Sequence, residues 1–510
     1  MIYEAVIGLE IHTELATETK LFCSCSAHAF GAEPNTHVCP ACYGMPGTLP
    51  RLNHRAVELG IKAGLLMGCR INPVSTFDKK NYFYPDLPSG HQLTQWFSPI
   101  CTDGFLEIDT PNNAVNPRET VRKRVGIKQI HLEEDAGKLI HDGEYTLIDM
   151  NRSGVPLIEI VTRPDLSSAE EVEAFLDKLR TLLRFARISG AVMAKGELRC
   201  DVNLSVRRAG SDKSGVRVEL KNMNSVDAIK KAIKYETERH IRALNGEGEP
   251  IKAETRGWDE TAQVSFSMRS KENAADYRYF PDPNIPPVYI DEDMLARVKA
   301  ELPELPEEKK QRYISEYGLS EYDATQITAS LALCTCFEEA VRVSNAPKDA
   351  VNWLLSEVMS ELNTRGIHRD DLPLSGEALG KLIILTAGGK VSRAGARKIL
   401  PVLFDAPDTD PHDYAERNGL TISADTDTLR RVAREAVEAD PKAVNDYLGG
   451  REKAFMSLFG RCMKTLGGNC DPQALKRELT VAIEEKTVNF SIQNQPWENI
   501  VFKDNKGDNG

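Results

Sequence analysis

The 510-residue chain has a formal net charge of −12, so it is poorly suited to coat nucleic acid without regard to sequence, because such binding depends on Lys and Arg neutralising phosphates. Its composition, 41% hydrophobic and 27% charged, is typical of a globular protein, and no apolar run approaches the roughly 18 residues of a membrane span. Glu4 and Glu10 stand where a signal peptide would be apolar, which predicts a cytoplasmic protein.

The length exceeds what one hydrophobic core usually organises, so several domains are expected. Short alternating strand patterns with few helices fill 1–293, and the pattern turns helical and charged over 294–405. After a linker at 406–411, short helices with good start signals fill 412–486. The extension 487–510 is expected to be disordered. The predicted class is α+β, a mixed-sheet cradle domain followed by a helical domain and a small all-helical tail domain.

The first strand pattern places Glu10 and His12 side by side. Apolar and polar residues alternate along 5–12, so these two side chains project from the same face of one strand. A carboxylate beside an imidazole can hold a metal ion or move a proton, although exposed strands also carry such pairs as solvated groups. The pair is therefore a plausible but incomplete ligand set.

Four of the eleven cysteines have a spacing typical of a metal site. Cys23 and Cys25 form one close pair, and Cys39 and Cys42 form a second pair after thirteen intervening residues. Two such pairs can supply four thiolates to a tetrahedral ion, for which zinc is the natural occupant. A redox pair or buried structural thiols are the alternatives. With four thiolates and no open position, the zinc would be structural.

Further carboxylates occur in two other segments. The run 131–135 (His-Leu-Glu-Glu-Asp) concentrates three acidic residues, whose mutual repulsion a cation would relieve. Glu159 lies in the apolar strand pattern 155–161, where an unpaired charge would be costly. Oxygen ligands with one imidazole suit magnesium better than zinc. The alternative is a solvated acidic turn, with Glu159 as an ion-pair partner.

A capped helix and two polar strand faces follow. Ser168 and Glu171 form a capping box ahead of an apolar stripe that runs to Leu183, which predicts a helix packed on a sheet. Polar and charged residues occupy alternate positions of 197–207 and of 217–221. These strands predict either a cleft for a charged substrate or an exposed sheet face with salt bridges.

Cations and aromatic rings are dense in 269–280. Arg269, Lys271 and Arg278 suit contact with phosphate groups, which would be those of ATP if this nucleotide binds, and the neighbouring tyrosines suit stacking on a base; a surface loop with buried rings is the alternative. Neither a phosphate-binding glycine loop nor a kinase signature set occurs in the sequence. In the tail, 449–477 has six cations against two acidic residues, which predicts a basic surface or a solvated helix face.

An ordered set of motifs resembles the GatB family, the B subunits of the tRNA-dependent amidotransferases, over nearly the whole chain to about residue 486. No single motif is decisive, but their order is specific. The motifs are VIGLEIH at 6–12, the cysteine quartet, KNYFYPDLP at 80–88, HLEED at 131–135, DMNRSGVPLIE at 149–159 and DYRYFPD at 276–282.

The resemblance implies that Glu10, His12, Glu134 and Glu159 surround Mg²⁺ and are the catalytic residues. ATP would phosphorylate the side-chain carboxylate of Glu-tRNA(Gln) or Asp-tRNA(Asn), and ammonia would then displace phosphate. The implied partners are an amidase (glutaminase) subunit that supplies the ammonia, a small bracing subunit, and the misacylated tRNA, which the tail domain would bind.

Two functions from other classes remain as alternatives. A metal-dependent hydrolase would use the same carboxylates and His12 without ATP, a partner or tRNA. A non-catalytic tRNA-binding scaffold would tolerate loss of Glu134 and Glu159 while keeping its affinity for tRNA. The large archaeal relative of the family is disfavoured, because no long insertion precedes the helical region.

Overall fold

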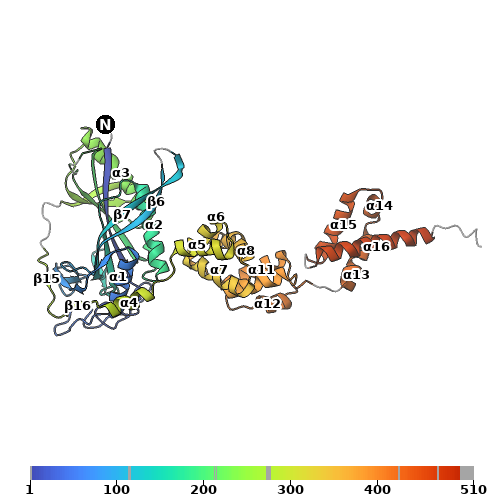
Figure 1. Cartoon of the computed structure of the whole chain (residues 1–510), viewed down its shortest axis with the longest axis horizontal. Helices are drawn as coiled ribbons and strands as arrows, with labels where there is room; N and C mark the ends of the chain where they lie inside the picture. The colour runs from blue at the N-terminus through green and yellow to red at the C-terminus, as the bar shows by residue number, and fades with distance from the viewer. Residues whose placement is uncertain are drawn as a thin grey trace, which may run out of the picture. The chain divides into compact units, whose positions relative to one another are not determined.

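The chain forms two compact units, the first ending at Pro306 and the second beginning at Glu307 (Figure 1). The expected boundary at 293 falls inside helix α4 (Glu292–Ala300), which packs against helix α1 (His54–Leu66) and belongs to the first unit. No helix among the described residues is both long and apolar enough to cross a membrane. The computed structural model describes residues 3–112, 116–211, 213, 215–270, 277–422, 426–467 and 470–493.

The first unit is built on one large mixed sheet, with strand order β14-β13-β12-β11-β1-β10-β7-β5-β4-β15. Strands β12 and β13 pair in parallel, and the other neighbours along this path are antiparallel. The bounds are β1 Tyr3–Glu14, β4 Asp78–Asn81, β5 His91–Thr94, β7 Asn116–Glu134, β10 Pro156–Thr162, β11 Leu198–Arg208, β12 Val218–Lys221, β13 Glu254–Asp259, β14 Val264–Ser270 and β15 Phe280–Pro281.

Shorter strands complete the unit. Strand β6 (Cys101–Asn112) pairs with β7 and also with β2 (Arg70–Ile71). Two small sheets are formed by β3 (Val74–Ser75) with β16 (Val288–Tyr289), and by β8 (Lys138–Asp142) with β9 (Tyr145–Asp149).

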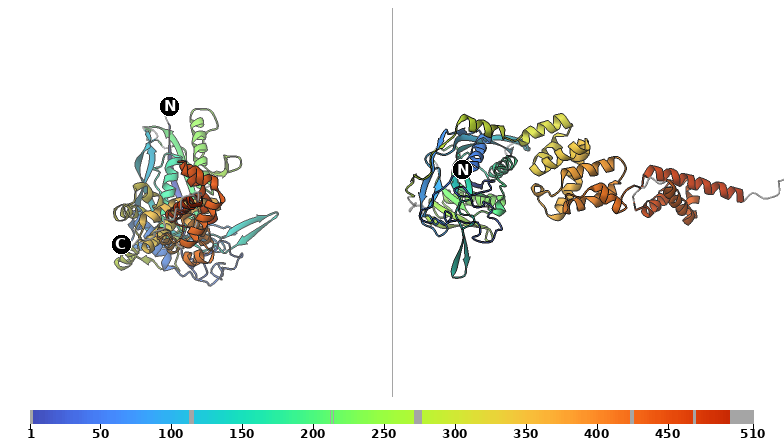
Figure 2. Two further views of the ribbon diagram at one scale, coloured as in Figure 1. Left: turned by 90° about the vertical axis from the view of Figure 1, so that its right-hand side faces the viewer. Right: turned by 90° about the horizontal axis from the view of Figure 1, so that it is seen from below.

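The large sheet has one apolar and one polar face. In β1 the predicted alternation is confirmed, since Ile7, Leu9 and Ile11 are fully buried in the core while Glu10 and His12 point to the other side. Helices α1, α2 (Ala169–Phe185) and α3 (Val226–Leu244) contribute to the same core and lie against the sheet (Figure 1 and Figure 2). The polar face is therefore available for a site.

The capped helix predicted from the sequence is α2. Ser168 Oγ accepts the Glu171 N–H at 3.1 Å, as the capping box requires. The Glu171 carboxylate reaches one residue further back than expected and accepts the N–H of Ser167 at 2.7 Å. The predicted apolar stripe is buried against the sheet at Val172, Phe175, Leu176, Leu179 and Leu183.

The described part of the second unit is helical, so the predicted α+β class, a mixed sheet followed by helices, is confirmed. A short 3-10 helix at Arg369–Asp371 joins α9 to α10, whereas that at Met193–Lys195 belongs to the first unit. Helices α8 and α9 are joined by the π-helical turn Leu354–Val358. The helices are α5 Pro306–Tyr317, α6 Glu321–Thr328, α7 Leu331–Ser344, α8 Pro347–Trp353, α9 Met359–Arg365, α10 Gly376–Ala387, α11 Arg393–Asp405, α12 Pro411–Arg417, α13 Thr426–Ala439, α14 Pro441–Leu448, α15 Glu452–Thr465 and α16 Pro472–Gln493.

The tail has a hydrophobic core of its own, formed by buried residues between Leu429 and Ile483. Helix α12 packs instead on α10 and α11, so the packing changes after α12 rather than at the expected linker 406–411. The expected disordered extension 487–510 begins inside α16, which ends at Gln493; residues 494–510 lie outside the described residues.

A buried ion network fastens α3 to the β13–β14 hairpin. Glu236 is fully buried, its Oε1 accepts the Arg239 Nε–H at 3.0 Å, and its Oε2 accepts the Ser265 hydroxyl at 2.8 Å. The His240 Nε2 lies 3.2 Å from Oε1. Burial alone would raise the pKa of Glu236, but the contacts with His240 and Arg239 outweigh it and lower the pKa to about 2.

We expect Glu236→Gln to lower the free energy of unfolding by roughly 3 kcal/mol, because it leaves the partly buried Arg239 and Arg256 without their charged partner. The folded pKa of about 2 lies below the ordinary 4.5, so the stabilisation should be complete above pH 4.5 and disappear as the pH falls toward 2. Urea denaturation at several pH values measures both effects. Glu238→Gln, which changes an exposed residue of the same helix, is the control. Equal midpoints of urea denaturation for the two variants at pH 7 would contradict the prediction.

Candidate functional site

A row of ionisable side chains crosses three neighbouring strands on the polar face of the sheet. The register sets His12 of β1 opposite Glu159 of β10, and Glu159 opposite His131 of β7. Glu10 and Glu133 lie two residues away from His12 and His131 on the same strands, so they share this face. We call these five residues the acid–imidazole cluster.

Two carboxylates and two imidazoles of the cluster are in direct contact. The His12 Nε2 lies 3.2 Å from Glu133 Oε1 and 3.3 Å from Glu159 Oε2. The His131 Nε2 lies 3.3 Å from the same Glu159 oxygen. The side chains of His131 and Glu133 are buried, whereas those of His12 and Glu159 are 20% and 14% exposed. The cluster therefore has a closed inner side and an accessible outer side.

Burial and charge shift the pKa values of the cluster in opposite directions. Burial would lower the pKa of His12, but the adjacent Glu133 raises it well above its usual value. Burial would raise the pKa of Glu159, but His131 and His12 hold it well below its usual value. Burial and then the charge of Glu159 raise the pKa of Glu10. Three carboxylates against two imidazoles leave an excess of negative charge that suits a cation.

The cluster fits a hard divalent cation. Ligand atoms of Glu10, His12 and Glu159 lie within 4.8 Å of one another, as do those of His131, Glu133 and Glu159. Adjacent ligands of an octahedral Mg²⁺ with bonds of about 2.1 Å are roughly 3.0 Å apart, close to the contacts of 3.2 and 3.3 Å around His12. Carboxylate oxygens with one imidazole are suitable ligands for this ion.

Glu134, the fourth residue expected at this site, points elsewhere. Side chains alternate along β7, so His131 and Glu133 face the cluster, while Leu132 is fully buried on the core side and Glu134 follows it. Glu134 Oε1 accepts the Leu93 N–H at 3.0 Å. The structure therefore places Glu133, and not Glu134, with Glu10, His12 and Glu159.

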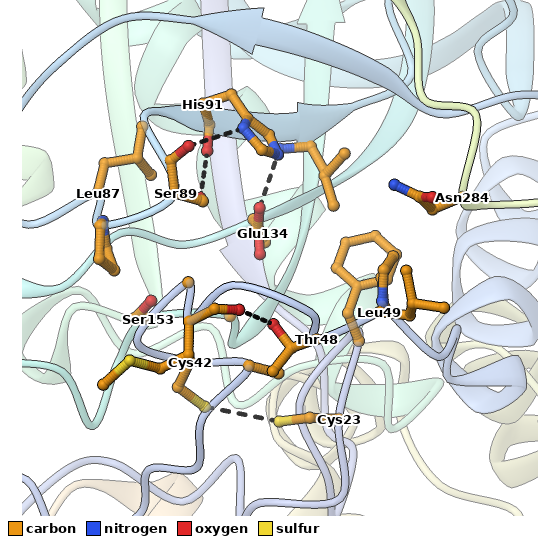
Figure 3. Close-up of a pocket in the computed structure, with 18 of the residues that line it drawn as sticks. Cys23, Cys42, Thr48, Leu49, Leu87, Ser89, His91, Glu134, Ser153 and Asn284 are labelled. Carbon is orange, nitrogen blue, oxygen red and sulfur yellow. Dashed lines mark hydrogen bonds between the residues drawn. The ribbon is translucent and has the colours of Figure 1, made fainter.

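Glu134 lines a cavity of about 280 Å³ on the core side of the sheet, together with Cys42 and His91 (Figure 3). Burial raises the pKa of Glu134 to about 7, against the lowering effect of the Leu93 N–H. The cavity is thus separated from the acid–imidazole cluster by strand β7 itself.

The four cysteines predicted as a metal site converge in the loop between β1 and α1. Their sulfur atoms lie within 4.8 Å of one another, with Cys42 Sγ at 3.6 Å from Cys23 Sγ and 3.8 Å from Cys39 Sγ. Tetrahedral zinc with Zn–S bonds of about 2.3 Å separates its sulfurs by roughly 3.8 Å, whereas a disulfide requires about 2.05 Å. The arrangement fits four thiolates around zinc.

A buried lysine supports this quartet. Lys20 is fully buried, and its Nζ lies 3.4 Å from Cys42 Sγ and donates to the Met150 carbonyl at 3.3 Å. A hydrogen bond from Cys23, with a smaller contribution from the Lys20 charge, lowers the pKa of the Cys42 thiol to about 4. Cys42 can therefore carry the negative charge that metal binding requires.

The residues expected to contact ATP phosphates lie at opposite ends of the strand order, because Arg269 is on β14 and Arg278 lies two residues before the start of β15. Arg278 is exposed, and Arg269 of β14 stands opposite Thr255 of β13. Lys271 lies outside the described residues. Next to Arg278, the ring of Tyr279 stacks on Trp96 with 4.5 Å between centroids, an aromatic contact between distant segments that sequence reasoning missed.

Ion pairs join the polar faces of β11 and β12, and the side chains of Lys221 and Asp201 are only 29% and 19% exposed. Lys221 pairs with Asp201 and lies 3.2 Å from Glu219, while Arg199 donates to Asp135 at 2.8 Å. Asp201 also stands opposite Glu10 in the register. These pairs continue the charged surface outward from the acid–imidazole cluster.

Among the described residues, two of the six tail cations form ion pairs: Arg451 lies 3.1 Å from Asp446 and Arg461 3.1 Å from Asp440. Lys476 lies over the Phe459 ring at 5.6 Å. The excess of positive charge in 449–477 thus belongs to helices α15 and α16 and the residues that flank them.

Known proteins resemble the chain along almost its full length. A family model described as the GatB/GatE catalytic domain matches residues 5–296, and one described as the GatB domain matches 335–483. The B subunit of the aspartyl/glutamyl-tRNA(Asn/Gln) amidotransferase of Thermotoga maritima is 46% identical over 490 residues, which cover 95% of this chain and 100% of that protein.

Two other relatives with the same description agree. The B subunit from Caldicellulosiruptor saccharolyticus is 45% identical over 490 residues, covering 95% of this chain and 100% of that protein. The one from Clostridium botulinum is 44% identical over 477 residues, covering 94% and 98% respectively. The chain therefore belongs to the GatB family, the B subunits of the tRNA-dependent amidotransferases.

Proposed function

We propose that this chain activates the side-chain carboxylate of an amino acid esterified to tRNA, using ATP, so that ammonia can convert the carboxylate to an amide. The acid–imidazole cluster carries the proposal, because it offers a cation site on an accessible sheet face. The description of the relatives as aspartyl/glutamyl-tRNA(Asn/Gln) amidotransferases supplies the substrate class, Glu-tRNA(Gln) or Asp-tRNA(Asn).

Glu10, His12, Glu133 and Glu159 would hold Mg²⁺. When bound there, the ion would neutralise phosphate charge during transfer of the γ-phosphoryl group. His131 holds Glu159 from the buried side, through the 3.3 Å contact between its Nε2 and Glu159 Oε2. A ligand fixed by such a neighbour needs little reorganisation when the substrate binds.

The proposed reaction has two steps. A carboxylate oxygen of the aminoacyl group attacks the γ-phosphorus of ATP, and the bond to ADP breaks. Ammonia then attacks the acyl carbon, phosphate leaves, and the nitrogen loses a proton. The energy of ATP is thereby used to convert a poor leaving group into phosphate.

The proposed partners are an amidase subunit that releases ammonia from glutamine and a small bracing subunit, with the tail helices contacting tRNA. Membership of a family of B subunits supports a complex of several chains. Large apolar side chains are exposed on the first unit, among them Phe83 at 94%, Leu49 and Met45. Leu49 and Met45 also line the cavity of Glu134, which makes this surface suitable for a partner.

The first prediction from the proposed function is release of phosphate from ATP by the assembled complex only in the presence of Glu-tRNA(Gln) or Asp-tRNA(Asn). Glu159→Gln should lower that release by about a hundredfold or more, because it weakens the charge that binds the cation, while tRNA affinity stays unchanged. A coupled phosphate assay and filter binding of tRNA measure the two quantities.

The alternatives give other results in the same assay. Absence of both tRNA-dependent phosphate release and tRNA binding would favour the metal-dependent hydrolase. Binding of tRNA without any phosphate release would favour the scaffold. Unchanged release by Glu159→Gln would show that the cluster is not the site of activation.

The second prediction separates the neighbouring residues Glu133 and Glu134. Glu133→Gln should weaken binding of Mn²⁺, a close analogue of Mg²⁺, by about tenfold or more, because this carboxylate faces the cluster. Glu134→Gln should leave Mn²⁺ affinity unchanged, because its side chain lies on the other face. Equilibrium dialysis measures both, and the opposite ranking would support the assignment made from the motif alone.

The third prediction concerns zinc. The purified chain should contain one zinc ion, and Cys39→Ser or Cys42→Ser should lose it, because a tetrahedral site needs all four thiolates. Cys69→Ala, which changes a buried cysteine outside the quartet, should retain the metal. Elemental analysis together with thiol titration checks this, and a disulfide without metal would support the redox-pair alternative.

A further inference from the structure

Two aromatic rings from distant segments form a flat platform on the first unit. The rings of Trp96 and Tyr279 are 4.5 Å apart between centroids and inclined by only 7°. Tyr277 meets Tyr279 edge-on, at 5.9 Å and 68°. Trp96 is nevertheless 49% exposed, so the stack with Tyr279 leaves a large part of its indole open to solvent.

The platform has a rigid support. The backbone N–H groups of Trp96 and Phe97 both donate to the Asp78 carboxylate, at 2.8 and 2.9 Å. Tyr279 directly precedes β15, whose Phe280 stands opposite Lys79 of β4. The two rings are therefore held by neighbouring strands of the sheet and lose little conformational freedom when a ligand binds.

The platform also lies next to the acid–imidazole cluster. Trp96 is two residues beyond Thr94, and Thr94 stands opposite Glu133 of the cluster in the register of β5 and β7. Burial raises the pKa of the Tyr279 phenol, and the carboxylates of Glu159 and Glu133 raise it further, as expected for groups within electrostatic reach.

A cation lies in the same region. Lys80 Nζ is 5.1 Å from the centroid of the Tyr277 ring and 3.5 Å from Gln92 Oε1. Lys80 is two residues from Asp78 on β4, so both side chains share the sheet face of Thr94, the register partner of Asp78. One surface thus combines a cation site, a lysine and a flat aromatic platform.

We propose that the open side of the Trp96 indole binds the adenine ring of a nucleotide whose phosphates lie at Lys80 and the acid–imidazole cluster. This inference rests on the proposed function, which requires ATP at the cluster. A purine stacks on an aromatic ring through its π-face, and this contact needs no hydrogen bonds from the protein. Phosphates need cations, which Lys80 and a metal at the cluster supply.

Adenine could come from two sources, ATP or the 3′-terminal adenosine of tRNA. ATP is favoured, because its base and phosphates belong to one small molecule and the platform and the cluster are neighbours. The test therefore uses ADP with Mg²⁺ as one probe. The other is an RNA hairpin with a 3′-CCA end, compared with the same hairpin without the terminal adenosine.

In the assembled complex, Trp96→Ala should weaken binding of ADP by about tenfold, within the range found when a stacking ring is removed. Pyrophosphate, which carries phosphates without a base, should bind the parent and the variant equally. Trp96→Phe should keep most of the affinity, since it keeps a ring. Phe97→Ala, which removes the next ring along the chain, 58% exposed, should not change ADP binding.

The outcomes separate this inference from the proposed function. Weaker ADP binding with unchanged pyrophosphate binding supports the platform and identifies ATP as the source. Weaker binding of only the hairpin that ends in adenosine supports stacking and assigns it to tRNA. Equal loss of ADP and pyrophosphate, or no loss of any probe, overturns the inference; the proposed function still stands if ADP binding requires Glu159. If the parent fails to bind ADP, the proposed function itself is wrong.

Discussion

The register of three antiparallel strands is the constraint on which the rest of the site depends. It sets His12 opposite Glu159 and Glu159 opposite His131, so a carboxylate is flanked by an imidazole from each neighbouring strand. A shift of one residue in either pairing would turn these side chains into the core and bring Ile or Leu to the polar face. The buried apolar residues of β1, β7 and β10 therefore fix the position of the ionisable ones.

Strand β7 separates two environments, one on each face of the sheet, and neighbouring residues of the strand point into different ones. Glu133 belongs to the acid–imidazole cluster on the polar face, and Glu134 belongs to the cavity beside the cysteine quartet. The low pKa of Glu159 keeps it ionised between two imidazoles, whereas burial raises the pKa of Glu134 to about 7. Identical side chains thus acquire different chemistry because the strand alternates between its two faces.

Much of this could be predicted where the signal is local. Alternation in β1 placed Glu10 beside His12, cysteine spacing predicted the quartet, and the cap of α2 was found in the sequence. Strand pairing is not local, so nothing in the sequence placed β10 between β1 and β7. The apolar residues Ile130 and Leu132 alternate with His131 and Glu133 along β7. This alternation could have assigned Glu133, rather than Glu134, to the polar face. The Trp96–Tyr279 stack could not be predicted, because it joins segments far apart in the chain.

The cysteine quartet lies in the segment that forms one wall of the cavity. Residues 15–53, all of which the structure describes, contain no helix or strand. Their backbone is held by the isolated bridge between Thr19 and Ser26 and by single hydrogen bonds such as that from the Leu21 N–H to the Gly154 carbonyl. Ordering such a segment costs conformational entropy that its few buried apolar side chains offset only in part. Four thiolates on one ion would supply a further constraint, with Lys20 beside Cys42 balancing their charge. On this argument the sheet would hold the cluster whether or not zinc is bound, whereas zinc at the quartet would stabilise the wall of the cavity on the other face.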